Sequence, residues 1–436
     1  MMKKNRTIYF LLALVCLGLQ SCLFQEEDYF DDSSANRATA DVKRCSELLE
    51  AAPNGWVMEY YVGKDYSLGG ITLLCKFDGQ RVTMASQIAG ADETVSSLYS
   101  VKSEQATMLS FDTYNYLVHY FGQPQGSMAD DPNGTLGGDY EFVISDATAD
   151  RIELKGKKYG NRIVMKAFSA DQTWKQYLTR IKKVEDDAFF YEYVLRMDGL
   201  YTGQMLRSNY TFIVTYYDEV GKVYQKTVPF MFTTDGMRFH EPVTIDGQTM
   251  QNFVWKNEEI SFVCTDEGAT GVKMKGIYID GYQSYDYYPG TYLMDFYRLN
   301  GATNQLEVAS QEIQLVKNED GKSYWLKGLE YDILVTYDKP RGGLSILPQF
   351  LKKVQGGYVY LAMWDLMNDY VLRSSAIGLI SYPTTDGIYL VDNGVWMGEI
   401  SGFIFGVYDS QDEEASFMGY TDAVAAIRLI KKTIEE

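Results

Sequence analysis

The sequence contains few of the residues on which most catalytic and metal sites depend. Only two histidines, His119 and His240, occur in 436 residues, and the five cysteines form no Cys-x-x-Cys pair. A Ser-His-Asp hydrolase would need one of these histidines, and the Gly-x-Ser-x-Gly motif is missing. His240-Glu241 is followed by Pro242, so the helix of a zinc protease is excluded there. We therefore find no recognisable catalytic motif and expect a protein that is not an enzyme.

Positive charge is scarce as well. The chain has 40 Lys and Arg against 59 Asp and Glu, which gives a formal net charge of −19. Nucleic acids and anionic membrane surfaces are bound by clusters of lysine and arginine. The charge balance argues against both as partners, and it does not identify a ligand.

No apolar run is long enough to cross a membrane as a helix. The apolar run 7–19 follows Lys3, Lys4 and Arg6, and it is shorter than the roughly 20 residues that a span needs. This pattern is typical of a signal peptide. The run ends in Leu-Gln-Ser-Cys22, which resembles a bacterial lipobox, in which the cysteine is diacylated and becomes the new N-terminus. We expect a signal peptide at 1–21 and a lipid anchor on Cys22. An ordinary signal peptide with a chance cysteine is the alternative.

The segment after Cys22 is acidic and has little apolar periodicity. Residues 22–40 include Glu26, Glu27, Asp28, Asp31 and Asp32. A segment of this composition buries too little apolar surface to offset its ordering entropy, which predicts a flexible tether. The acidic run also resembles the surface-export signal of Bacteroidota lipoproteins. We therefore expect an outer-membrane lipoprotein that faces the cell surface.

Three cysteines remain outside the signal and the anchor, namely Cys45, Cys75 and Cys264. Their odd number and wide spacing indicate neither a disulfide framework nor a metal cluster. We predict buried thiols. The sequence leaves one bridge open, either Cys75–Cys264 or Cys45–Cys75.

The remainder of the chain is predicted to be mainly β. It contains 36 Tyr and 21 Phe, and short alternating runs recur between turn signals, as at 71–77, Asp78-Gly79 and 81–84. Apolar residues at helical spacing predict two helices, at 39–51 and 171–188. The polar segment 265–271 divides two β-sheet modules, each a sandwich or a barrel, at 41–268 and 272–436.

Several motifs in order resemble one family. The helix that ends in Pro53-Asn54-Gly55-Trp56 is similar to the opening of many Bacteroidota lipoproteins. Residues 109–115 (LSFDTYN), 137–142 (GGDYEF) and 154–161 (LKGKKYGN) resemble the family catalogued as domain of unknown function 4302. The resemblance is best over 41–265. It implies a surface lipoprotein, often encoded near outer-membrane nutrient-uptake systems, and it carries over no activity and no catalytic residues.

Two polar groups are candidates for small sites. His119, with Asn115 beside it, either contacts a ligand or is hydrogen-bonded within the fold. Asp131, Asn133 and Asp139 lie in a Gly-rich loop whose oxygen ligands would suit calcium. That loop departs from the EF-hand pattern, so a solvated connection is the alternative.

The segment 277–297 is unusually rich in tyrosine. Tyr282, Tyr285, Tyr287 and Tyr288 fall in its loop. Tyrosine combines a flat apolar ring with a hydroxyl group, which suits sugars or peptides. These four are our candidate ligand-binding residues, with packing of the loop as the alternative.

These observations lead to one functional hypothesis and two alternatives. We expect a non-enzymatic binding or accessory component of nutrient capture, with a glycan or peptide as ligand. The alternatives are a glycoside hydrolase that uses paired carboxylates and a structural subunit of an outer-membrane uptake complex.

Overall fold

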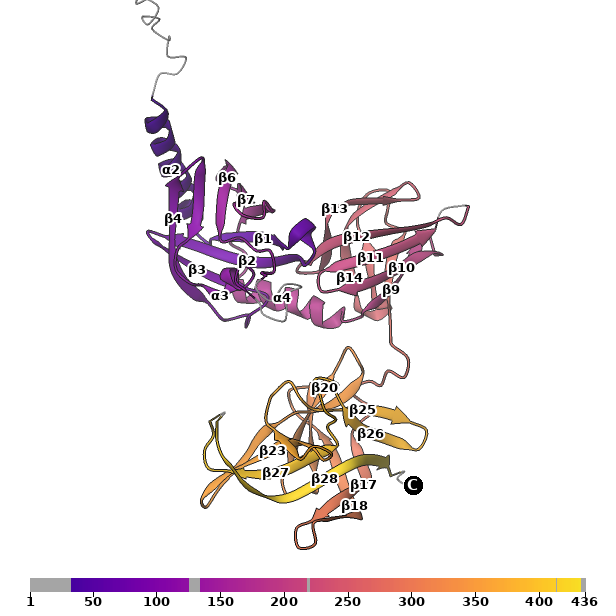
Figure 1. Ribbon diagram of the computed structural model, residues 1–436. Helices are drawn as coiled ribbons and strands as arrows, with labels where there is room; N and C mark the ends of the chain where they lie inside the picture. Colours follow the sequence, from indigo (N-terminus) through magenta and orange to yellow (C-terminus); the bar gives the residue numbers. More distant parts are fainter. Residues whose placement is uncertain (1–32, 125–133, 218–219, 413, 433–436) are drawn as a thin grey trace, which may run out of the picture.

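The protein is built almost entirely of antiparallel β-sheet. The computed structural model describes residues 33–124, 134–217, 220–412 and 414–432, and it contains two closed barrels followed by a twelve-stranded sheet (Figure 1). This confirms the prediction of a mainly β chain with an N-terminal and a mid-chain helix. No helix in the described part of the chain has the length and apolar character needed to span a membrane.

Barrel 1 is an eight-stranded meander in which each strand pairs with its sequence neighbours. Pairing of the first strand with the last closes it, with Trp56 opposite Ala167. The Asp78-Gly79 turn connects the second and third strands as predicted, and Gly79 takes the positive φ of +59° that such turns favour. The strands are β1 (Trp56–Val62), β2 (Gly69–Asp78), β3 (Arg81–Ser86), β4 (Val95–Ser103), β5 (Thr107–Phe111), β6 (Glu141–Ala147), β7 (Arg151–Gly156) and β8 (Arg162–Ala167).

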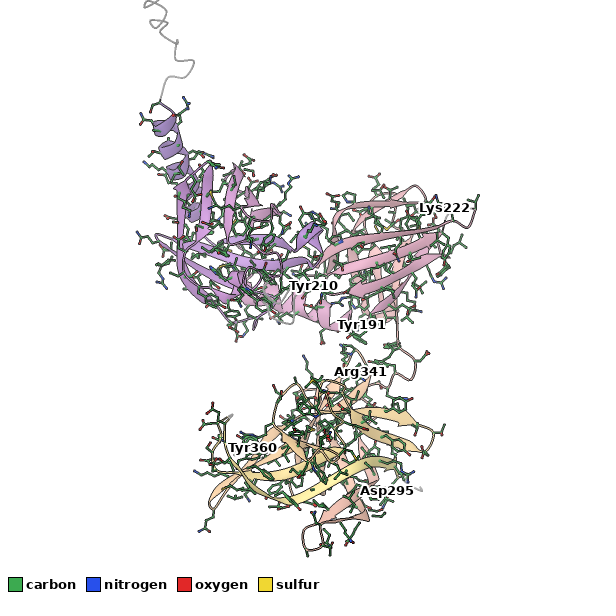
Figure 2. All side chains as sticks on the ribbon, in the orientation of Figure 1. Tyr191, Tyr210, Lys222, Asp295, Arg341 and Tyr360 are labelled. Carbon is green, nitrogen blue, oxygen red and sulfur yellow. The ribbon has the colours of Figure 1, made fainter. Side chains whose placement is uncertain are left out.

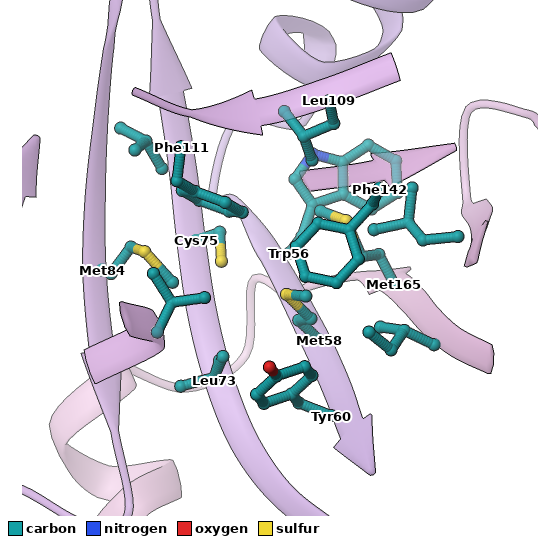
Figure 3. Close-up of a cluster of buried hydrophobic side chains, with 14 of the residues drawn as sticks. Trp56, Met58, Tyr60, Leu73, Cys75, Met84, Leu109, Phe111, Phe142 and Met165 are labelled. Atoms are coloured by element: carbon teal, nitrogen blue, oxygen red, sulfur yellow. The ribbon is translucent and has the colours of Figure 1, made fainter. Parts of the chain in front are cut away.

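The interior of barrel 1 is filled by large side chains. Alternation along β1 directs Trp56, Met58 and Tyr60 inward, and all three are fully buried. They share one core with Phe142 of β6 and with Met165 of β8, which is paired with Met58 (Figure 3). The barrel is therefore a packed core, as small barrels commonly are.

Helix α2 (Ser34–Ala51) packs against barrel 1. The Ser33 hydroxyl caps it by accepting from the Asn36 backbone N–H, and the buried Cys45 and Leu49 face the barrel. The Trp56 indole N–H donates to the Leu49 carbonyl at 2.9 Å. The helix thus begins before residue 40, so the last seven residues of the predicted tether are helical, because a good cap and several alanines favour helix there. Residues 22–32 lie outside the described residues.

Barrel 2 repeats the eight-stranded meander. Its first strand pairs with its second strand on one side and with its last strand on the other. The second of these pairings closes the barrel and places Val272 opposite Met197. Aromatic rings fill it, with Tyr193, Phe212, Phe230 and Phe239 almost fully buried. Its strands are β9 (Glu192–Met197), β10 (Leu200–Ser208), β11 (Thr211–Tyr217), β12 (Val223–Phe232), β13 (Gly236–Ile245), β14 (Gln248–Lys256), β15 (Ser261–Cys264) and β16 (Val272–Ile277).

The segment predicted to divide the modules is a loop within barrel 2. Residues 265–271 connect β15 to β16, and β16 is needed to close the barrel. The predicted module 41–268 thus contains nearly two barrels, and 278–289 leads into the C-terminal module (Figure 1). Short one-turn helices, α3 (Tyr116–His119), η2 (Lys64–Tyr66) and η4 (Asn257–Glu259), lie in loops of the barrels.

Helix α4 (Trp174–Asp187) joins the two barrels. A capping box of Thr173 and Gln176 begins it, and its buried face presents Leu178, Ile181 and Val184. From this helix, the Lys182 ammonium group donates to two backbone carbonyls after β3, at 2.7 and 2.8 Å. The helix is therefore bound to barrel 1 while it leads directly into barrel 2.

A buried ion cluster also crosses between the barrels. Glu59 of β1 lies 2.7 Å from the Lys166 ammonium of β8 and 2.5 Å from the Arg238 guanidinium of β13. The Glu59 side chain is only 13% exposed. Beside it, the His240 ring of β13 lies 4.2 Å from the rings of Tyr61 and Tyr66, and burial lowers the pKa of His240. Charge pairing and ring packing together fix barrel 2 against barrel 1.

The C-terminal module contains a ring of eight paired strands with a branch. The ring passes through β17 (Gly290–Asn300), β18 (Gln305–Lys317), β19 (Ser323–Lys327), β20 (Ile333–Asp338), β21 (Gly343–Ile346), β25 (Leu379–Thr384), β26 (Gly387–Asp392) and β28 (Phe417–Lys431), which pairs back to β17. The branch leaves β28 through β27 (Gly402–Tyr408), β23 (Gly357–Asp365) and β22 (Gln349–Val354), with β24 (Tyr370–Leu372) also paired to β23.

The three cysteines in the described residues are free and buried, which confirms the prediction of buried thiols. Cys75 lies in barrel 1 and Cys264 in barrel 2, and burial raises the pKa of each thiol, that of Cys264 to about 11. Protonated, buried thiols of this kind are inert side chains of the core.

Replacing Glu59 tests whether the ion cluster holds the barrels together. Burial alone would raise the pKa of Glu59, but Arg238 and Lys166 outweigh it and hold that pKa below its ordinary value. We expect Glu59→Gln to lower the unfolding free energy of the barrels by about 3 kcal/mol at pH 7, since the largely buried Arg238 guanidinium loses its partner. Urea titration of the mature chain would measure this.

The matched control is Glu104→Gln. Glu104 also binds two lysines, Lys102 and Lys157, but its side chain is 39% exposed, so we expect a much smaller change in the unfolding free energy than for Glu59→Gln. Because the pKa of Glu59 is lowered on folding, its contribution is complete at pH values above about 4.3 and is lost as the pH falls through the lower, folded pKa. Equal effects of the two variants would contradict this interpretation of the cluster.

Candidate functional site

The branch of the C-terminal module has one face that is only partly covered. Alternation along β23 directs Val359, Leu361 and Met363 into the core of the ring. Tyr360 and Trp364 therefore point to the opposite face. Part of that face forms a small second core with Ile404 and several alanines, and the rest is aromatic.

Four aromatic residues form a row across this face, one from each of four adjacent strands. We call Phe350, Tyr360, Tyr408 and Phe417 the aromatic row; they come from β22, β23, β27 and β28. Successive ring centroids lie 5.4, 5.7 and 5.5 Å apart. The outer rings, Phe350 and Phe417, are 45% and 44% exposed, whereas Tyr408 is 4% exposed. The row is therefore anchored in its middle and open at its ends.

A glycine makes room for the row. A Cβ atom on Gly406 of β27 would lie 2.9 Å from the Tyr408 ring and 3.1 Å from the Phe417 ring. Such contacts are too close for a real side chain, so both rings would have to move. Gly406 thus allows the rings of Tyr408 and Phe417 to lie against the sheet.

Three residues of the row, Tyr360, Tyr408 and Phe417, form the floor of an open hollow of about 630 Å³. The fourth, Phe350, packs on Tyr360 outside the lining of this hollow. Tyr360 is labelled on the C-terminal module in Figure 2. The segment after β24 forms one wall with Arg373, Ser374 and Ser375, and Gln411 lies on the other side. Among the described residues that line the hollow, Arg373 alone carries a charge. Apolar rings beside hydroxyl, amide and guanidinium groups are the usual composition of a small-ligand or glycan surface.

Arg373 connects the wall to the floor. Its guanidinium carbon lies 4.2 Å from the Tyr408 ring centroid and 4.9 Å from that of Tyr360, and its Nη2 donates to the Asp412 carbonyl at 2.5 Å. Burial raises the pKa of Tyr408, so this ring stays neutral beneath the guanidinium. The cation and the two rings therefore hold the hollow in one shape.

The tyrosine-rich loop does not form one exposed surface. Tyr288 is fully buried and donates to the Gly342 carbonyl at 2.8 Å, and Tyr285 donates to the Ser323 carbonyl at 2.8 Å. Tyr282 is half-buried, with its ring 6.0 Å from Phe189 at the start of barrel 2, and Tyr287 is 39% exposed beside Lys431. The four residues attach the segment 278–289 to the C-terminal module. These contacts match the alternative, packing of the loop, because the hydroxyl groups of Tyr285 and Tyr288 bond carbonyl groups of the protein itself.

His119 and Asn115 serve a helix cap. The Asn115 side chain is buried, accepts from the Leu117 backbone N–H at 3.1 Å and donates to Ser97 at 3.2 Å. The Asn115 backbone N–H donates to Nδ1 of His119 at 3.1 Å, and the Tyr140 ring stacks on the imidazole at 4.7 Å. These contacts match the alternative in which both residues are bonded within the fold.

The predicted calcium ligands fall partly outside the described residues. Asp131 and Asn133 lie there, whereas Asp139 is buried and accepts from the backbone N–H groups of Lys158 and Tyr159. Burial raises the pKa of Asp139 in spite of these hydrogen bonds. Within the described ranges, no three His, Cys, Asp or Glu side chains are grouped as a metal site would require.

A second hollow, of about 660 Å³, lies between α4 and the C-terminal module. Three of the four cationic residues that line it, all but Lys322, bond backbone carbonyl groups of the protein. Lys339 bonds the Asp186 carbonyl at 2.7 Å, Arg207 bonds the Ala188 carbonyl at 2.8 Å, and Lys182 is bound to barrel 1. This hollow therefore joins modules, and the aromatic row is the better candidate for a ligand.

The sequence contains one local signal for the row. Apolar and aromatic residues alternate over 358–364, which places Tyr358 and Tyr360 on one face of a strand. Which face is covered depends on how the ring closes, which the alternation does not reveal. The tyrosine loop was more conspicuous only because its residues are adjacent in sequence.

Comparisons with known proteins bear on the family alone. Residues 26–257 match the family described as domain of unknown function DUF4302, and residues 265–404 match a second family, DUF4987, also described as a domain of unknown function. No curated protein matches the chain. Among solved structures, a protein of unknown function from the DUF3598 family of Nostoc punctiforme is similar to this chain at 7% sequence identity. The match covers 57% of this chain and 99% of that protein, with a TM-score of 0.15.

Proposed function

The chain belongs to the DUF4302 family, whose match covers more than half of it, and we propose that it is a non-enzymatic, glycan-binding surface lipoprotein of nutrient capture. The aromatic row carries this proposal. Three of its four rings line an open hollow beside hydroxyl and amide groups, and the two outer rings of the row are nearly half exposed. Sugar rings have apolar faces and polar edges, which match this combination.

The packed barrels support placing the ligand on the outside. Barrel 1 holds Trp56, Phe111 and Phe142, and barrel 2 holds Phe212, Phe230 and Phe239, all nearly inaccessible to solvent. A small barrel that carries a ligand inside must leave its interior open. The barrels therefore act as a support, and the proposed binding surface belongs to the C-terminal module.

Attachment to the outer membrane is the second part of the proposal. It is supported by the lipobox-like residues 19–22, the apolar run before them and the acidic residues after them. The lipid on Cys22 would hold the protein at the membrane, and an outer-membrane uptake protein would be the partner that receives the glycan. A single acyl group anchors weakly, so the diacylated cysteine of a lipobox would suit stable attachment.

Binding of glycans tests the first part. We expect the mature chain to bind neutral oligosaccharides on a glycan array. In calorimetry, Phe350→Ala and Phe417→Ala should each raise the dissociation constant about tenfold, the equivalent of about 1.4 kcal/mol of binding free energy. Tyr382→Ala is the matched control, because Tyr382 is 62% exposed on the same module but lies outside the row. Unchanged affinity in both row variants, or no binding to any glycan, would refute the proposal.

Cell fractionation tests the second part. We expect Cys22→Ala to move the protein from the membrane fraction to the soluble fraction, because the acylated sulfur is removed. Cys16→Ala, within the apolar run, should leave the protein with the membranes, since that residue is removed with the signal peptide. A Cys22→Ala protein that stays in the membrane fraction would contradict the anchor.

A further inference from the structure

We propose that the aromatic row binds an extended glycan chain through its internal units, with the chain lying across strands β22, β23, β27 and β28. This inference rests on the proposed function and specifies its ligand. It follows from three properties of the row, which are its continuity, its open ends and the position of its polar groups.

The row is continuous over four strands. Adjacent strands of a sheet lie about 4.8 Å apart, and the three ring-to-ring distances, 5.4, 5.7 and 5.5 Å, follow that spacing without a gap. Neighbouring rings meet edge to face, at interplanar angles of 61°, 86° and 62°, so one sugar unit would stack on about one ring and leave the other rings of the row uncovered. A chain that crosses the strands would contact Phe350, Tyr360 and Phe417 together.

Both ends of the row are open in the part of the chain that the structure describes. At one end, β22 is the last strand of the branch, and Phe350 is 45% exposed on it. At the other end, Phe417 is the first residue of β28 and is 44% exposed. The exposure of both outer rings leaves room for a chain to continue beyond each of them, which a site for a chain terminus would not need.

The polar groups lie over the middle of the row. Arg373 is placed above Tyr360 and Tyr408, and the Tyr360 hydroxyl donates to the Gln411 carbonyl at 3.4 Å. The side chains of Ser374, Ser375 and Gln411 line the hollow with these rings and would bond a central unit, while Phe350 and Phe417 would stack on the units to either side. This order of contacts is that of a site for the interior of a chain.

The direction of the row also separates a glycan from a peptide. A peptide that adds to a sheet runs along the edge strand and bonds its backbone groups. The edge strand β22 carries Lys352 and Lys353, and charged residues of this kind discourage strand addition. The row crosses β22 at Phe350, so a ligand on it lies nearly perpendicular to an added strand.

A length series tests the inference with the mature chain. The probes are linear oligosaccharides of glucose, xylose and mannose, from monosaccharide to hexasaccharide, measured by calorimetry. We expect affinity to rise about tenfold between disaccharide and tetrasaccharide in the series that binds, and then to level off. Phe350→Ala and Phe417→Ala should each remove most of that gain and leave disaccharide affinity within about twofold, whereas Tyr382→Ala should change neither.

A blocked chain end provides the second measurement. A hexasaccharide coupled to a bulky tag at its reducing end should bind as tightly as the free sugar, because internal units make the contacts. Equal affinity for all lengths, or loss of binding on tagging, would overturn this inference while the proposed function stands. Binding of no oligosaccharide at any length, or of extended peptides in their place, would overturn both. Melting curves of the row variants establish that each is folded.

Discussion

Closure of the strand ring is the constraint on which the rest of this structure depends. Once β1 pairs with β8, and β9 with β16, every second residue must face a narrow interior. Large side chains such as Trp56 and Phe212 occupy that interior and exclude water from it. The interiors of both barrels are thus filled by their own side chains. The barrels contact each other through the ion pair of Glu59 and Arg238, and they support the C-terminal module.

The C-terminal module relaxes this constraint at one strand. One edge of β28 pairs with β17, while the other is shared by β27 in its first half and β26 in its second. The sheet therefore continues beyond the ring and acquires a second face. Tyr360 and Phe417 lie on that face, and Gly406 leaves room for the rings. We propose that this branch is the origin of the binding function.

Local sequence patterns predicted the elements better than their assembly. The Asp78-Gly79 hairpin, the buried thiols and the two helices follow from turn chemistry, cysteine spacing and apolar periodicity. The number of closed strand rings does not follow from such local patterns, because closure pairs residues as distant in the sequence as Trp56 and Ala167. The same limit applies to the tyrosines. Tyr288 and Tyr360 look alike in the sequence, and only the closed ring determines that the first is buried and the second lines a surface.

Hydrogen–deuterium exchange on the mature chain, with and without the tightest-binding oligosaccharide, tests the central claim most directly. Because the proposed ligand lies on the branch, exchange should slow in residues 349–360 and 403–417 and stay unchanged in both barrels. Slower exchange within barrel 1 or barrel 2, or in the tyrosine-rich segment 278–289, with no change in the branch, would contradict the claim.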